Sequence, residues 1–443
     1  MSYELMAVLM FLSMLLMLLT GRHIFAIVGG VATIFSLVLW GRGGEAMPFH
    51  ASFILLNWYP LLTLPLFIFM GYMFAKSGIA DDLYRMLHVW MGPVRGGLAI
   101  GTIALMAIIA AMNGLSVAGM AIGATLCLPE MLKRGYDKVM LTGVVQAGSS
   151  LGIMIPPSVV LVLYGMIARQ SIGRLWMAGF LPGILMAILF MIYIAIRCQL
   201  QPHLGPPLPL EERRQFSWGK KFRLLRAGLV PIVIIFLMTG LFLMGVTSLV
   251  ESSAVGVAAT IIAAAANHRL TWKVMNDVLV DTLSVSCMFM WVILAALCFG
   301  AVFDGLGAVH AVESIFIERF ALSPWGVMIM MQLSFLVMGC FLDDTAMLVI
   351  VAPLYVPLVI KLGFDPIWYG VLYTITCQIA YLSPPFGYNL FLMKALAPKD
   401  SGITTRDIYR SIIPFVGVMI VTLAIVMAFP QIALWLPNHY FAK

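Results

Sequence analysis

Residues 148–158 read GSSLGIMIPPS, and residues 383–389 read SPPFGYN. Each Pro-Pro pair interrupts a stretch, 138–167 or 367–396, that is otherwise apolar enough to cross a membrane as one helix. Proline has no backbone N–H and clashes with the preceding helical turn, so a Pro-Pro pair frees backbone carbonyl groups. Within a bilayer, such groups are tolerated only where protein or a polar cavity satisfies them. These two interruptions decide the fold that we predict, because the rest of the chain must enclose them.

The composition of the chain is that of a membrane protein. Of its 443 residues, 62% are hydrophobic and 10% are charged, whereas a soluble domain is about half apolar and about a quarter charged. A water-soluble enzyme of this size is thereby excluded. The net charge of +7 fits basic cytoplasmic loops, and we expect no nucleic-acid partner. The six cysteines form no CxxC pair and the sequence has no phosphate-binding loop, which argues against a disulfide framework, a cysteine metal site and ATP as the energy source.

The remaining apolar runs predict helical membrane crossings. Eight of them have a suitable length: 3–20, 24–40, 52–76, 175–196, 228–247, 252–266, 279–303 and 409–436. Two longer stretches, 97–133 and 326–362, are interrupted at Asn113–Ser116 and at Leu342–Thr345. Each is either a pair of crossings or a re-entrant hairpin, and its polar tip favours the hairpin, in which the tip lies at mid-membrane rather than among headgroups.

The basic residues predict which loops face the cytoplasm. With the basic loop 197–226 placed inside, 20 of the 26 Lys and Arg residues fall on that side and six remain outside. This asymmetry agrees with the positive-inside rule. Both termini are then predicted to be periplasmic.

The two halves of the sequence resemble each other. Gly135, Asp137 and Pro156-Pro157 recur 228 residues later as Gly363, Asp365 and Pro384-Pro385. Each half holds five crossings and one hairpin, and an odd number of crossings turns the second copy upside down. We therefore predict an all-α polytopic membrane protein built as an inverted repeat: residues 1–196, a cytoplasmic basic linker 197–226, and residues 227–443. In this division, scaffold helices occupy 1–76 and 228–303. Inverted repeats with interrupted helices are typical of secondary transporters.

The first interruption predicts a cation site. Hydroxyls, an amide and freed carbonyls at the ends of broken helices suit a Na⁺ ion held by neutral oxygens. The alternative is that the small residues merely allow close helix packing. We predict the first Na⁺ site from the tip of the first hairpin and the first broken crossing, at Asn113, Ser116, Gly148, Ser149, Ser150 and Pro156.

The second interruption predicts another cation site. Two adjacent carboxylates at membrane depth are costly and mark function by default. The alternative is an ordinary loop at headgroup level. The second Na⁺ site is predicted at Asp343, Asp344, Thr345, Ser383, Pro384 and Gly387.

Polar residues beside the two breaks are predicted to face a substrate, namely Gln146, Ser158, Gln378, Tyr388 and Asn389. For the two glutamines, packing is an equally valid interpretation. Glu251 is interpreted as a helix-start carboxylate, and the stretch around Asp81, Asp82 and Arg85 as an amphipathic surface helix.

Several long motifs resemble one family. Residues 132–137 (LKRGYD), 148–158, 251–256 (ESSAVG) and 384–391 (PPFGYNLF) are similar to the large membrane subunit of tripartite ATP-independent periplasmic (TRAP) transporters, the DctM-like family. The resemblance covers nearly the whole chain.

The resemblance implies an elevator-type importer in the bacterial inner membrane. The hairpins and broken crossings would move as one domain against the scaffold, coupled to Na⁺, with two ions expected. The implied substrate is an organic acid, such as a dicarboxylate. The implied partners are a small four-helix membrane subunit on a separate chain and a periplasmic substrate-binding protein. A stand-alone Na⁺/anion symporter of the same superfamily is the alternative transporter. A membrane-embedded enzyme is a further alternative, although no catalytic cluster supports it.

Overall fold

The computed structural model describes residues 3–18, 20, 22–40, 42–114, 116–209, 211, 218–307, 323–339, 344–384, 387–398 and 401–441. All regular structure in these residues is helical. Six segments of the described chain are long and apolar enough to cross a membrane: Tyr59–Lys76, Ile172–Leu200, Lys221–Gly240, Leu249–Ala266, Trp272–Gly305 and Thr405–Ala428.

The chain begins with α1 (Tyr3–Leu18), α2 (Ile24–Leu39), α3 (Ala46–Leu56), the 3₁₀ turn η1 (Tyr59–Leu62) and α4 (Thr63–Lys76). The crossing predicted over 52–76 is wrong at its start, because the chain leaves the helix at Asn57–Trp58 and the apolar span runs over Tyr59–Lys76. Pro60 is the second residue of η1 and has no N–H to donate back into α3. The amphipathic prediction is confirmed by α5 (Ile79–Met91), which buries Leu83 and Leu87 and exposes Asp82 and Arg85.

The first hairpin comprises α6 (Gly97–Asn113), α7 (Ser116–Ile122), the π-helical turn η2 (Gly123–Cys127) and α8 (Leu128–Lys133). The following crossing is broken into α9 (Lys138–Ser150), η3 (Leu151–Ile153) and α10 (Val159–Ile167). The interruption predicted from Pro156-Pro157 is therefore present. Next come α11 (Ile172–Leu200) and the short turn η4 (Pro202–Leu204), so the predicted basic linker 197–226 begins inside a helix.

The next helices are α13 (Trp218–Ile235), the π-helical turn η5 (Phe236–Gly240), α14 (Leu241–Leu243), α15 (Leu249–Ala266) and α16 (Trp272–Gly305). The end of the predicted linker is thus helical as well. Glu251 is confirmed as a helix-start carboxylate: its side chain accepts from Ser248 N, and the Ser248 hydroxyl accepts from Glu251 N.

The last helices are α18 (Pro324–Gly339), α19 (Asp344–Lys361), α20 (Pro366–Leu382), α21 (Tyr388–Leu396), α22 (Thr405–Ala428) and α23 (Gln431–Phe441). The second predicted interruption is present between α20 and α21. The crossing predicted over 409–436 is wrong at its end, because α22 stops at Ala428 and α23 starts after Pro430.

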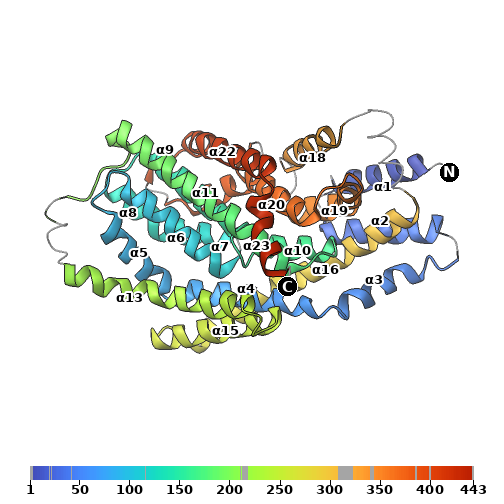
Figure 1. The fold of residues 1–443 in the computed structure, drawn as a ribbon, viewed down its shortest axis with the longest axis horizontal. Helices are drawn as coiled ribbons and strands as arrows, with labels where there is room; N and C mark the ends of the chain where they lie inside the picture. The colour runs from blue at the N-terminus through green and yellow to red at the C-terminus, as the bar shows by residue number, and fades with distance from the viewer. Residues whose placement is uncertain are drawn as a thin grey trace.

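The helices around the two breaks pack against one another. In Figure 1, α13 and α15 lie along one long edge of the molecule and α18 and α22 along the other, with α10 and α20 between them. The α9 helix contacts α6, α7 and α22, and α10 contacts α11, α19 and α20. Both broken crossings therefore lie inside the bundle, where neighbouring helices can satisfy their backbone groups.

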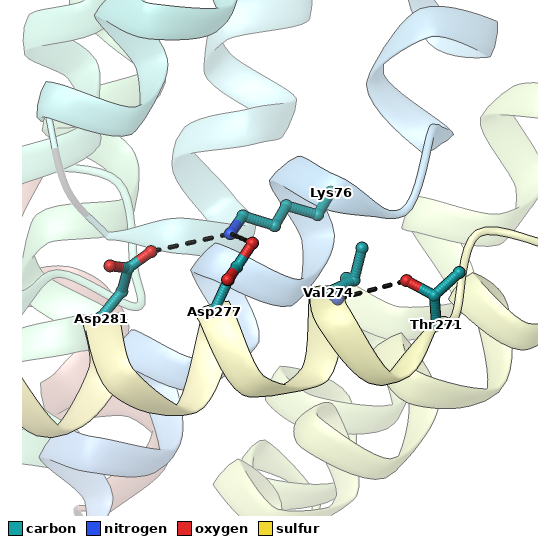
Figure 2. Close-up of polar contacts among 5 residues, drawn as sticks. All are labelled: Lys76, Thr271, Val274, Asp277 and Asp281. Carbon is teal, nitrogen blue, oxygen red and sulfur yellow. Dashed lines mark hydrogen bonds and ion pairs between the residues drawn. The ribbon is translucent and has the colours of Figure 1, made fainter.

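An ion-pair network joins α4 to α16. Figure 2 shows Lys76 Nζ between Asp277 and Asp281, at 3.6 and 3.7 Å from their Oδ2 atoms. The two aspartates are one turn apart and so lie on the same face of α16. At the start of that helix, the Thr271 hydroxyl caps the N–H of Val274.

Candidate functional site

The first break is buried, and the half-helix on each side of it begins at a capping residue. Asp137 Oδ1 accepts from Met140 N at 2.9 Å and starts α9. After the break, Ser158 starts α10: its hydroxyl accepts from Leu161 N at 3.2 Å and donates to the Ile153 carbonyl at 2.5 Å. All residues from 140 to 166 are buried. The Ser158 hydroxyl, predicted to face the substrate, is therefore engaged in holding the two half-helices together.

The tip of the first hairpin lies against this break. Gly114 ends α6 with φ +65°, and its carbonyl accepts from Val159 N at 3.3 Å. A Cβ atom at Gly114 would lie 2.1 Å from the Pro157 carbonyl oxygen. Only glycine tolerates both the left-handed backbone and this close approach. The predicted contact between the first hairpin and the first broken crossing is therefore present.

Three buried polar side chains connect the two halves of the chain. The Ser116 hydroxyl donates to Asn389 Oδ1, and Asn389 Nδ2 donates to Ser149 Oγ, both at 3.3 Å. The exposed fractions of Ser116, Ser149 and Asn389 are 3%, 1% and 0%. We call these residues the Ser116–Ser149–Asn389 cluster. It brings together α7 of the hairpin, α9 of the first broken crossing and α21 of the second.

The hydrogen bonds within this cluster are long. At 3.3 Å they exceed the usual range for an N–H or O–H donor and an oxygen acceptor. Ser149 also donates to the Gln146 carbonyl at 2.8 Å. The cluster thus presents three uncharged side-chain oxygens, held by weak mutual bonds, beside a break in the helix.

Gln146 and Gln378 lie next to the cluster and are fully buried. Gln378 Nε2 donates to the Ser150 carbonyl at 2.9 Å, and Gln146 Nε2 donates to Ser411 Oγ at 3.0 Å. Within the described part of the chain, the Oε1 atom of each glutamine is buried without a hydrogen-bond partner. A buried acceptor left unpaired costs about 1–3 kcal/mol, so these two oxygens are available to a ligand.

The second predicted Na⁺ site is only partly described. Ser383 is half-buried and its hydroxyl donates to the Ile379 carbonyl at 2.7 Å, while Pro384 is exposed. Gly387 is buried, and a Cβ atom there would lie 2.9 Å from the Ser383 carbonyl oxygen. Asp343 lies outside the described residues, as do the side chains of Asn113, Asp344, Thr345 and Tyr388.

Two polar contacts were not predicted. Ser411 of α22 is the partner of Gln146, and no pattern in the sequence distinguishes this serine at the start of an apolar helix. The Thr376 hydroxyl of α20 donates to Gln332 Oε1 of α18 at 2.6 Å. Gln332 is a polar residue inside an apolar helix, and that signal could have identified it.

Comparison with known proteins identifies the family. Residues 11–432 match the family described as tripartite ATP-independent periplasmic transporter, DctM component. The chain belongs to this DctM family. It is therefore a multi-pass membrane permease subunit of a TRAP transporter and not an enzyme.

Its relatives in this family are distant in sequence. The chain is 29% identical over 380 residues to the C4-dicarboxylate TRAP transporter large permease protein DctM of Pseudomonas aeruginosa, with 86% of each chain covered. It is 28% identical over 387 residues to the sialic acid TRAP transporter permease protein SiaT of Haemophilus influenzae, covering 86% of this chain and 60% of that one.

Solved structures show the same fold at low identity. The YdaH transporter of Alcanivorax borkumensis matches with a TM-score of 0.65 at 12% identity, covering 93% of this chain and 100% of that one. MtrF of Neisseria gonorrhoeae, an antimetabolite efflux pump, matches with a TM-score of 0.60 at 16% identity, covering 90% and 85%. The chain is thus an all-helical, multi-span membrane protein that resembles these transporters.

Proposed function

We propose that this DctM permease imports an organic acid together with Na⁺, by an elevator mechanism, and receives the acid from a periplasmic binding protein. The Ser116–Ser149–Asn389 cluster is the observation that carries the proposal. It gathers uncharged oxygens from two broken crossings and one hairpin. Na⁺ is a hard cation that binds such oxygens, and broken helices supply them at the centre of transporters.

The unpaired glutamine oxygens extend the proposed ion site. Gln146 Oε1 and Gln378 Oε1 are buried acceptors with no hydrogen-bond partner in the described part of the chain. A bound cation would be the missing partner of these two oxygens, and its bonds would replace the long hydrogen bonds among Ser116, Ser149 and Asn389. The predicted second site around Asp344 and Ser383 would hold a second ion. Both termini of this permease are proposed to be periplasmic, which is the orientation that the basic loops predict.

An organic acid is the substrate class that the relatives favour. The names of the DctM and SiaT relatives give a C4-dicarboxylate and a sialic acid, and both carry a carboxylate. SiaT is longer than this chain, which spans 60% of it. A small four-helix membrane subunit is proposed as a partner of this permease, and the periplasmic binding protein as the component that delivers the substrate.

Reconstitution tests the proposed function. The permease, its small subunit and its binding protein would be placed in liposomes, and uptake of carboxylates would be measured with an inward Na⁺ gradient. We expect uptake only when Na⁺ and the binding protein are both present. Equal uptake without the binding protein would instead indicate a stand-alone symporter. Equal uptake when K⁺ replaces Na⁺ would exclude Na⁺ coupling.

A further inference from the structure

A pocket of about 650 Å³ opens where the first turn of α9, the last turns of α11 and the first turns of α22 meet. This place lies at the start of α9, whereas the first break follows the end of that helix. The residues that matter to its chemistry are Asp137, Tyr193, Arg197, Arg410, Ser411 and Ile413.

Two guanidinium groups provide the charge of the pocket. Arg197 comes from α11 and Arg410 from α22, and both are exposed. Neither has a hydrogen bond or ion pair to another described residue. Arginine binds phosphate through parallel N–H donors, and two such groups on facing helices suit one phosphate.

The nearby carboxylates are already engaged at helix starts. Asp137 lines the pocket, but its Oδ1 accepts from Met140 N as the cap of α9. Asp407, one turn before Arg410, accepts from Thr404 N at 2.9 Å and from the Thr404 hydroxyl at 2.7 Å. Lys138 adds a further positive charge and donates to the Gly402 carbonyl at 3.0 Å. Among the residues that line the pocket, two arginines therefore accompany one carboxylate, and the net charge favours an anion.

The rest of the pocket is apolar and continues onto the outer surface of the helices. Ile413 lines it and is 68% exposed, and Ile196, next to Arg197, is 54% exposed. Tyr193 also lines the pocket, is half-buried and packs edge-to-face on Phe415. On a membrane-spanning helix, exposed isoleucines contact lipid chains rather than water. The arginines suit the phosphate of a phospholipid headgroup, and the apolar wall suits one of its acyl chains.

We propose that this pocket binds the phosphate of an anionic phospholipid between Arg197 and Arg410, with an acyl chain lying along Ile413 and Tyr193. Inorganic phosphate shares the headgroup chemistry but gains nothing from the apolar wall. The positive-inside pattern predicts both arginines on the cytoplasmic side, where the leaflet is anionic. The lipid would bridge α11 and α22, and the Ser411 hydroxyl in the same pocket accepts from Gln146 of α9.

Native mass spectrometry of the full-length permease tests this proposal. The protein would be purified in detergent and titrated with phosphatidylglycerol or with phosphatidylcholine. We expect phosphatidylglycerol to bind about tenfold more tightly than phosphatidylcholine, and this preference to be lost in the Arg197→Ala/Arg410→Ala double variant. Arg406→Ala is the matched control, because Arg406 is exposed on the same helix and does not line the pocket. It should keep the preference.

The other results of this experiment overturn the proposal. An unchanged lipid preference in the double variant would exclude the pocket as the site. Displacement of phosphatidylglycerol by millimolar inorganic phosphate would indicate a site for a free anion. If the double variant is not monodisperse, each single variant is measured, and a loss of less than threefold in both also contradicts the assignment.

Discussion

At the scale of single residues, Asn389 connects the two halves of the site. It lies 240 residues after Ser149 and 273 residues after Ser116, yet it bonds to both. All three residues were predicted to bind a ligand, but Asn389 was assigned to the substrate and the two serines to Na⁺. The sequence identifies polar residues beside each break, because each break is local. It does not reveal which of them meet, since that depends on how the two halves pack.

Gly114 offers a test of how tightly the hairpin tip packs on the first break. We expect Gly114→Ala to lower the melting temperature of the purified permease, because the new Cβ atom would meet the Pro157 carbonyl oxygen at 2.1 Å. Gly135→Ala is the control: Gly135 also has a positive φ, of +74°, but nothing lies within 4 Å of a Cβ atom there. Gly135→Ala should lower the free energy of unfolding only by the backbone strain, about 1–2 kcal/mol. Gly114→Ala should lower it by clearly more. Equal losses in the two variants would contradict the packing of Gly114 on Pro157.

At the scale of helices, most of the predicted crossings are found, and the errors come from single prolines. Pro60 and Pro430 lie where the apolar pattern continues but the helix does not. Pro182, Pro231 and Pro414, by contrast, lie inside helices. When one proline removes an N–H, a neighbouring helix can satisfy the freed carbonyl. A single proline can therefore either kink a helix or end it. A Pro-Pro pair does decide, and both predicted breaks are present.

The α4–α16 ion pairs of Figure 2 should contribute little to stability. Lys76, Asp277 and Asp281 have side chains that are 32%, 44% and 49% exposed, and exposed ion pairs are worth about 0–1 kcal/mol. Because the two aspartates share one lysine, Asp277→Asn alone should change the melting temperature less than Lys76→Ala does. The double variant Asp277→Asn/Asp281→Asn should match Lys76→Ala. A large fall in melting temperature from Asp277→Asn alone would contradict the sharing of Lys76 by the two aspartates.

At the scale of the whole molecule, the proposed coupling determines whether transport moves charge. One positive charge moving inward gains about 2.3 kcal/mol per 100 mV of membrane potential. If two Na⁺ ions accompany each substrate, a monocarboxylate would carry one net positive charge inward and a dicarboxylate none. We therefore expect an inside-negative potential to accelerate uptake of a monocarboxylate in the reconstituted system and to leave a dicarboxylate unaffected. Equal acceleration of both would contradict a fixed stoichiometry of two.

The Na⁺ dependence of uptake is the most direct test of the Ser116–Ser149–Asn389 cluster. Uptake would be measured in liposomes over a range of Na⁺ concentrations for the parent chain, Ser149→Ala and Asn389→Ala. The control, Thr260→Ala, also removes a buried hydroxyl, but one that donates within its own helix α15 to Val257. If the cluster binds Na⁺, both site variants need several-fold more Na⁺ for half-maximal uptake and the control does not. An unchanged Na⁺ requirement in both site variants, with uptake still active, would show that the coupling ion binds elsewhere.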